Sequence, residues 1–293
     1  MTAPTRYRVT HRTDYRYGGP VTSGQTIVHL LVRETPHQHV TAADITIEPP
    51  PDHRHTHIDG FGNLVSYLAV EHPHEHLTVT ATSDVSVVVP EPPVGSPPWE
   101  DVPARLAGER SADGLLARQC ALASSLVPVE DAVVEYARPS FPPGRPFHDA
   151  VVDLAHRIYT DFVFDPTVTD VTTPLGDVLA SRRGVCQDFA HLAIGCVRAV
   201  GLPARYVSGY LETDPPPGEP KLTGSDASHA WLAVYVPGYG WFDLDPTNDQ
   251  APPHRHVTVA WGRDYADVTP VRGVVFGPVV DQELDVAVDV VRA

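Results

Sequence analysis

A proline-rich segment, PEPPVGSPP at residues 90–98, separates two parts of the chain whose hydrophobic patterns have different periods. Before it, apolar and polar residues alternate, as in residues 7–17, and a period of two is typical of strands with one wet face. After it, a helical period appears at Val151, Leu154, Ala155, Ile158, Tyr159 and Phe162. The pattern predicts an amino-terminal β-domain at 1–90, a semi-rigid linker at 91–98 and a mixed domain at 99–293.

The same patterns predict individual elements. Strands are expected at 7–17, 26–32, 44–48, 64–70 and 77–89 before the linker, and at 205–211, 229–236, 241–245 and 284–290 after it. Helices are expected at 151–162, at about 173–184 with Thr173 as N-cap and Pro174 at its first position, and at about 186–200. Several short strands with turn residues between them suggest a sandwich or barrel for the first domain.

Composition excludes several classes of function. The 293 residues carry 21 Lys and Arg against 37 Asp and Glu, a net charge of −16, which argues against a sequence-independent grip on nucleic acid. No stretch approaches the ~20 apolar residues of a membrane span, and no signal peptide is visible. Three cysteines cannot form a closed disulfide framework, so we expect a cytoplasmic protein that binds neither nucleic acid nor membrane.

Cys186 is the strongest candidate for a reactive group. It follows Gly184 in RGVCQDF and begins an apolar-periodic helix. A cysteine in the first turn of a helix lies at the positive end of the helix dipole, which favours the thiolate, and its own N–H can donate to an oxyanion. The other two cysteines, Cys120 and Cys196, lie in apolar surroundings and are expected to be packing residues.

His229 and Asp245 are candidates for the base and its orienting acid. They lie on two expected strands joined by the turn Pro-Gly-Tyr-Gly at 237–240, which places them within about one register step of each other. A carboxylate there can accept a hydrogen bond from one imidazole nitrogen while the other nitrogen faces the sulfur. Asp243, on the same strand face, and Asn248 remain alternative orienting groups.

The three motifs resemble a known family. The runs GVCQDFAHLAIGCVRAVGLPARYVSGY, SHAW and GWFDLDPTN, within about 147–248, resemble the core of the transglutaminase-like superfamily, which includes transglutaminases and bacterial cysteine hydrolases. The runs RYRVTHRTDYRYGGPV and DGFGN are similar to the amino-terminal β-domain of bacterial members, and GRDYADVTPVRGV to their C-terminal extension. The resemblance implies an α+β fold, with a papain-like transglutaminase core preceded by an all-β, sandwich-like domain.

By this resemblance Cys186 matches the nucleophile, His229 the base and Asp245 the orienting acid, and no cofactor is needed. Protein-crosslinking members stabilise the oxyanion with a tryptophan upstream of the nucleophile and carry another directly after it. Here no tryptophan lies between position 100 and Cys186, and Gln187 follows the cysteine. These differences favour hydrolysis of a peptide or other amide over transfer to lysine amines. Substrate-binding residues are expected among Gln187, Tyr210, Trp231 and Trp241.

Two sets of alternating histidines offer a different hypothesis. Either set could place imidazoles on one strand face and chelate zinc: His53, His55 and His57, and His72, His74 and His76. Pro73 interrupts the second set, and no carboxylate or thiol motif accompanies either. We therefore expect surface histidines and no metal, with a zinc-dependent activity as the alternative. His191 is expected to be structural.

The sequence thus predicts a cysteine hydrolase or acyltransferase that attacks an amide through a thioester, with a peptide or protein as its substrate. Two alternatives remain open, a protein-crosslinking transglutaminase and a non-catalytic scaffold of the same fold that binds peptides.

Overall fold

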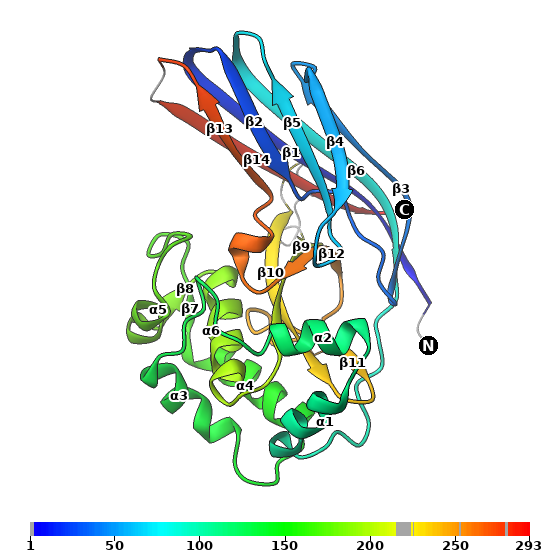
Figure 1. The fold of residues 1–293 in the computed structure, drawn as a ribbon, viewed down its shortest axis with the longest axis vertical. Helices are drawn as coiled ribbons and strands as arrows, with labels where there is room; N and C mark the ends of the chain where they lie inside the picture. The colour runs from blue at the N-terminus through cyan, green and yellow to red at the C-terminus, as the bar shows by residue number, and fades with distance from the viewer. Residues whose placement is uncertain (1–2, 215–223, 225, 252, 279–280) are drawn as a thin grey trace.

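The computed structural model describes residues 3–214, 224, 226–251, 253–278 and 281–293. It has two parts, a β-rich part at the top of Figure 1 and a mixed part below it. The strands of the upper part are β1 (Thr5–Val21), β2 (Ser23–Val28), β3 (Gln38–Glu48), β4 (His53–Ile58), β5 (Leu64–Val70), β6 (His74–Val87), β13 (Val271–Phe276) and β14 (Gln282–Arg292). The helices of the lower part are α1 (Val102–Gly108), α2 (Ala112–Gln119), α3 (Asp131–Ala137), α4 (Phe147–Asp161), α5 (Leu175–Ser181) and α6 (Cys186–Ala199), and its main strands are β9 (Ala204–Leu211), β10 (Ala227–Val236), β11 (Gly240–Leu244) and β12 (His256–Gly262).

The upper part is a sandwich of two antiparallel sheets, ordered β14-β1-β6-β3 and β13-β2-β5-β4. Alternation makes one face of each sheet apolar, and the two faces bury a common core that includes Val28, Leu68, Leu77 and Val79. In β1 the odd residues from Tyr7 to Thr13 point inward, as the period of two predicts.

The lower part is built on the sheet β11-β10-β9-β12, and α6 packs against β9 and β10. Nearly every side chain of α6 is buried, because the helix lies between the sheet and the helices α3, α4 and α5. Ala230, Leu232, Val234 and Val236 face this main core, whereas Trp231 and Ala233 belong to a second cluster on the other face of β10. The expected α+β class is confirmed.

Two amide side chains of the sandwich close the free edge of β12. Asn63 Oδ1 accepts from the Trp261 N–H at 2.9 Å, and Asn63 Nδ2 donates to the Trp261 carbonyl at 2.8 Å. Gln38 makes the same pair of bonds with the Thr258 N–H and carbonyl, at 2.8 and 2.7 Å. An edge strand left open exposes unpaired backbone groups, so these bonds join the two parts and complete the sheet. Asn63 belongs to the DGFGN run noted in the sequence.

Most expected elements are present, with shifted ends. The strand at 64–70 has the predicted bounds, while the one expected at 26–32 ends at Val28 and the one at 77–89 spans His74–Val87. The helix expected at 173–184 is only Leu175–Ser181, with Pro174 as N-cap, and Arg182 after it takes a left-handed φ of 56°. Strand β4 was not predicted, because all six of its residues are exposed and it has no apolar alternation.

The C-terminal strands return to the sandwich. The division drawn from the sequence placed residues 99–293 in one catalytic domain, but β13 pairs with β2 and β14 pairs with β1 along eleven residues. Such pairing depends on residues more than 200 positions apart, which local patterns do not reveal.

None of the helices in the described part of the chain has the length and apolar character needed to cross a membrane.

Candidate active site

The hairpin of β10 and β11 brings His229 to Asp245. Leu232 pairs with Leu244, so Asp245 follows at the level of Trp231, and His229 lies diagonally beyond. His229 Nε2 donates to Asp245 Oδ2 at 2.8 Å, and both side chains are buried. The bond assigns the proton on Nε2, because an ionised carboxylate can only accept. The other ring nitrogen is left to face the cysteine.

Asp245 is surrounded by hydrogen-bond donors. Its Oδ2 accepts from His229 Nε2, from His256 Nε2 at 2.8 Å and from Asn248 Nδ2 at 2.7 Å. Its Oδ1 accepts from the backbone N–H groups of Thr247 at 2.9 Å and Asn248 at 3.3 Å. Burial alone would raise the pKa of Asp245, but the hydrogen bonds and charges of the two histidines lower it far below the usual value. The carboxylate is therefore ionised throughout the physiological range.

Cys186 is the first residue of α6 and is half-buried beside His229. Burial lowers the pKa of His229, but hydrogen bonds with Asp245 and Cys186, and their charges, raise it to about 10. The ring therefore holds both protons at neutral pH. Because this pKa lies above the ordinary 6.5, the stabilisation is complete below about pH 6.5 and is lost as the pH rises through about 10.

A carboxylate also lies at the start of α6, where the sequence indicated only the positive end of the helix dipole. Asp188 Oδ2 accepts from the Val185 N–H at 2.8 Å and from Thr169 Oγ1 at 2.7 Å, which caps the helix. Gly184 leaves room for it, since a Cβ there would lie 2.6 Å from Asp188 Oδ2. Burial raises the pKa of Asp188. The hydrogen bond satisfies the Val185 N–H just before the helix, but the negative charge of Asp188 offsets part of the attraction of the helix start for a thiolate.

Cys186 and His229 open onto a cleft of about 350 Å³ between the core and the sandwich. One wall belongs to the core and includes Val185, Gln187, Tyr206 and Tyr265. The opposite wall comes from β1 and β14 and consists of His11, Thr13, Tyr15, Leu284 and Val286. The amino-terminal sandwich, to which the sequence assigned no role, therefore forms half of the cleft.

The four expected substrate-binding residues lie in different places. Gln187 lines the cleft, and its Nε2 donates to the Val171 carbonyl at 3.2 Å. Tyr210 is buried against the sandwich, where its ring lies 5.5 Å from that of His11. Trp231 and Trp241 line a second cavity on the other face of β10, away from the sulfur.

The two alternative orienting groups have other roles. Asp243 Oδ2 accepts from Trp231 Nε1 at 2.9 Å and has no hydrogen bond with His229. Asn248 donates to Asp245 and so holds the carboxylate rather than replacing it. The structure thus brings Asp245, rather than Asp243, to the imidazole of His229.

His256 is a residue that sequence reasoning missed. Its Nε2 lies 2.8 Å from Asp245 Oδ2, and its Nδ1 lies 2.6 Å from the His254 carbonyl. Both neighbours accept, so both bonds form only when both ring nitrogens carry a proton. The ring also packs edge-on against Trp231, with centroids 5.0 Å apart. His256 comes from β12, outside the three motifs, and no local signal marks it.

We expect His256→Phe to lower the rate constant for alkylation of Cys186 about tenfold at neutral pH, because Asp245 loses a charge-assisted donor while the aromatic ring is kept. His254→Phe is the matched control, because that side chain is exposed and contributes only its backbone carbonyl to the network. Equal rate constants in the two variants would show that His256 does not position Asp245.

The remaining cysteines and His191 lie in the core. Burial raises the pKa of Cys120 to about 11 and that of Cys196 to about 12, so both thiols are unreactive at neutral pH. His191 Nε2 accepts from the Tyr265 N–H at 3.1 Å, and burial lowers the pKa of its ring to about 4. All three cysteines are free.

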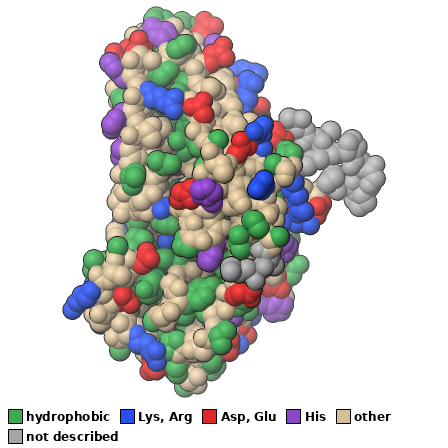
Figure 2. Space-filling model, turned by 90° about the vertical axis from the view of Figure 1, so that its right-hand side faces the viewer, with side chains coloured by type: hydrophobic (Ala, Val, Ile, Leu, Met, Phe, Trp, Pro, Cys, Tyr) green, Lys and Arg blue, Asp and Glu red, His purple; other side chains and the backbone are tan. Residues whose placement is uncertain are grey.

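The alternating histidines do not converge. Those of β4 are exposed along a strand, where His53 lies 3.7 Å from Glu71, while His72 pairs with Asp52 at 3.0 Å. Figure 2 shows histidine side chains on the surface of the β-rich part. In the part of the chain that is described, His229, Asp245 and His256 are the one trio with ligand atoms within 4.8 Å of one another. These atoms are already hydrogen-bonded to each other, so the trio is a proton network.

Comparison with known proteins agrees with this geometry. Residues 7–86 match the bacterial transglutaminase-like N-terminal region, and residues 137–246 match the transglutaminase-like superfamily. An uncharacterized protein of Mycobacterium tuberculosis is 48% identical over 295 residues, which cover 98% of this chain and 92% of that protein. The chain belongs to the transglutaminase-like superfamily.

Other similar proteins are more distant. A protein of Cytophaga hutchinsonii that is proposed to be a cysteine protease superposes with a TM-score of 0.72 at 19% identity, over 98% of this chain and 91% of that one. At this identity the likeness concerns the fold alone. A protein-glutamine gamma-glutamyltransferase of Pseudomonas aeruginosa is 37% identical over 73 residues, 25% of this chain and 11% of that protein.

Proposed function

We propose that this protein is a cysteine-dependent hydrolase of amide bonds that acts through a thioester on Cys186. The observation that carries the proposal is the chain of contacts from Cys186 to His229 and from His229 Nε2 to Asp245 Oδ2, 2.8 Å away, at the wall of an open cleft. A thiol, a base and a group that orients the base are what nucleophilic catalysis by cysteine requires.

The proposed reaction has two stages. The Cys186 sulfur attacks the amide carbonyl carbon, and the N–H of Cys186, which has no partner inside the helix, donates to the oxyanion. His229 then gives its proton to the leaving amine, the C–N bond breaks, and a thioester remains. In the second stage His229 takes a proton from water as its oxygen attacks the thioester carbonyl carbon; the C–S bond breaks, the acid is released, and the Cys186 thiolate beside a protonated His229 is restored. Asp245 remains ionised and holds the His229 ring in position through both stages.

The cleft favours an apolar acyl group. Its described lining includes Val185, Val271, Leu284 and Val286, with Tyr15, Tyr206 and Tyr265 as aromatic walls. Such a lining binds an uncharged chain better than a charged one. Water as the acyl acceptor is favoured by Gln187 at the position after the nucleophile, while the similarity to a protein-glutamine gamma-glutamyltransferase makes transfer to an amine the alternative.

The proposal is tested by comparing the parent protein with Cys186→Ala on a library of peptides and simple amides, with released amine and incorporated amine measured separately. We expect release to exceed incorporation, and Cys186→Ala to abolish both. Full activity in Cys186→Ala would overturn the proposal, and the absence of both release and incorporation in the parent protein would favour a binding scaffold. An excess of incorporated amine would show a crosslinking acyltransferase instead.

Alkylation provides a test that needs no substrate. Iodoacetamide is expected to modify Cys186 about a hundredfold faster than Cys196 at neutral pH, because the sulfur of Cys186 lies beside an imidazolium and that of Cys196 is sealed in the core. Equal rate constants for Cys186 and Cys196 would show that Cys186 is not an activated nucleophile.

The cytoplasmic location of the protein stays a prediction from the sequence.

A further inference from the structure

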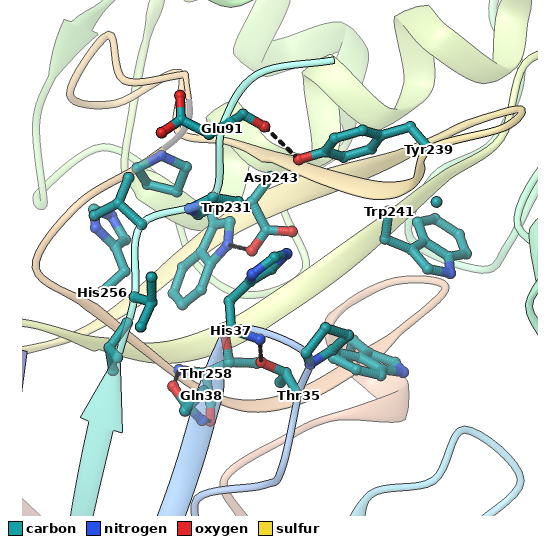
Figure 3. Close-up of a pocket in the computed structure, with 18 of the residues that line it drawn as sticks. Thr35, His37, Gln38, Glu91, Trp231, Tyr239, Trp241, Asp243, His256 and Thr258 are labelled. Carbon is teal, nitrogen blue, oxygen red and sulfur yellow. Dashed lines mark hydrogen bonds between the residues drawn. The ribbon is translucent and has the colours of Figure 1, made fainter. Parts of the chain in front are cut away.

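A second cavity lies behind the residues of the proposed reaction. It encloses about 580 Å³ between the sandwich and the outer face of the sheet β11-β10-β9-β12. Figure 3 shows Trp231 and Asp243 at its centre, Trp241 on one side and His256 on the other. Cys186 does not line it, so it is separate from the cleft in which the proposed reaction takes place.

The cavity exists because a row of side chains across the sheet has a small residue in its middle. Ala233 of β10 pairs with Arg205 of β9 on one side and with Asp243 of β11 on the other. All three side chains point to the same face, since directly paired residues share a face. The methyl group of Ala233 leaves the space between the two charged side chains open.

Arg205 lies in an aromatic stack at the bottom of this cavity. Its guanidinium carbon is 3.5 Å from the ring centre of Trp261 and 4.0 Å from that of Trp241. On the far side of Trp261, the guanidinium carbon of Arg33 lies 3.2 Å from the ring centre. The four side chains thus alternate cation, indole, cation and indole.

Two polar atoms of Arg205 are unpartnered although the residue is only 4% exposed. Its Nε and Nη1 are buried without a hydrogen bond, and in the described part of the chain no carboxylate comes within the 4.0 Å of an ion pair. Trp241 Nε1, another donor of the same cavity, is buried without a partner as well. Buried donors with no acceptor are unfavourable, and more so when they are charged.

Arg205 lines the base of the cavity, and a second guanidinium, that of Arg33, lies behind Trp261 and outside the lining. Burial and the neighbouring Arg205 lower the pKa of Arg33 to about 9, and burial lowers that of Arg205 to about 10, so both remain cations at neutral pH. Asp243 is the nearest deep carboxylate, and its Oδ2 is already occupied by Trp231 Nε1. The other two acidic residues of the lining, Glu91 and Asp113, are exposed at the rim.

We propose that this cavity binds a small molecule that carries a carboxylate on a flat, apolar body, with the carboxylate on Arg205 and the body against the indole rings. A carboxylate would supply acceptors for Arg205 and Trp241 Nε1 together, and guanidinium groups bind carboxylates in two-pronged fashion. The rings of Trp231, Trp241 and Trp261 and the apolar lining residues Val87 and Val89 would pack on the body.

The test uses the four tryptophans as reporters in a spectrum of the ¹⁵N-labelled full chain, with benzoate as the probe and benzamide as its neutral match at equal ionic strength. We expect benzoate to shift the indole N–H signals of Trp241 and Trp261 in a saturable way and benzamide to leave them in place. Trp99 is the internal control, because its Nε1 donates to the Pro142 carbonyl outside the cavity. Tryptophan-to-phenylalanine variants assign the signals.

Two variants give opposite expectations. Arg205→Met, which keeps the length of the side chain without its donors, should weaken benzoate binding at least about tenfold. Asp243→Asn, whose amide oxygen can still accept from Trp231, removes a repelling charge and should tighten binding, so the proposal stays testable if Arg205→Met fails to fold. The proposal is overturned if benzoate gives no saturable shift, if benzamide gives the same one, or if Asp243→Asn weakens binding. None of these readouts depends on turnover, so they are independent of the reaction proposed for Cys186.

Discussion

Asp245→Asn is expected to lower kcat for amide hydrolysis about 10⁴-fold, the loss that removal of the orienting carboxylate causes in a catalytic triad. Asp245 Oδ2 accepts from His229, His256 and Asn248 at once, and a neutral amide cannot serve two imidazole donors and an amide donor in the same way. The pKa of His229, which Asp245 raises, should fall with it.

The change should also reduce the free energy of unfolding by about 3 kcal/mol, because the buried imidazolium of His229 loses its counter-charge and His256 loses the carboxylate with which it is hydrogen-bonded. Stopped assays of amide release give kcat, and urea unfolding followed by circular dichroism gives the stability. Asp264→Asn is the matched control, because that buried carboxylate accepts from the Leu126 and Ala266 N–H groups, away from His229. It should lose stability while its folded fraction keeps kcat. If Asp245→Asn keeps kcat within about threefold of the parent, Asp245 is not the orienting acid.

Asn63→Ala is expected to reduce the free energy of unfolding by about 3 kcal/mol. Asn63 is fully buried and joins the sandwich to the core through the Trp261 N–H and carbonyl, and within the sandwich it accepts from Arg33 Nη1 and donates to Asp59. Alanine would leave the Trp261 N–H and carbonyl without partners at the edge of β12. Each buried group left unsatisfied is unfavourable by ~1–3 kcal/mol.

Urea unfolding measures this effect, with Gln25→Ala as the control, since Gln25 is an amide on an exposed face of the same domain. The control should stay within about 0.5 kcal/mol of the parent. Asn63→Ala should also slow alkylation of Cys186, because the cleft has one wall on each part. The effect should be no more than a few fold, since the triad lies wholly in the core. A stability equal to that of Gln25→Ala would show that the Asn63 bonds do not hold the two parts together.

The patterns that predicted the fold best are those with a short range. Strand β5 and helix α6 have the bounds that alternation and the 3.6-residue period indicate, because each pattern is complete within the element. The pairing of His229 with Asp245 was predictable for the same reason, since one tight turn at 237–240 sets the register of the hairpin. The proposed roles of Cys186 and its partners still await their tests.

What the sequence left open depends on distant segments. β4 has no apolar face, and the partners of β13 and β14 lie at the other end of the chain. Trp231 and Trp241 were placed with the nucleophile because they flank the motif residues, and by alternation they do share a strand face with His229 and Asp245, yet they line the other cavity. A residue's nearness in sequence to His229 therefore did not decide which cavity it lines.

The amino-acid sequence by itself determined the class of fold and the pairing of His229 with Asp245, because periodicity and a tight turn act over a short range, and its three motifs carried the resemblance to the family. Only the tertiary structure decided that His256 joins the network of Asp245, that the sandwich supplies half of the cleft, and that Arg205 lies unpaired between two indoles. The physical reason is that these contacts join strands distant in sequence, and their geometry is set by the packing of the two parts as a whole.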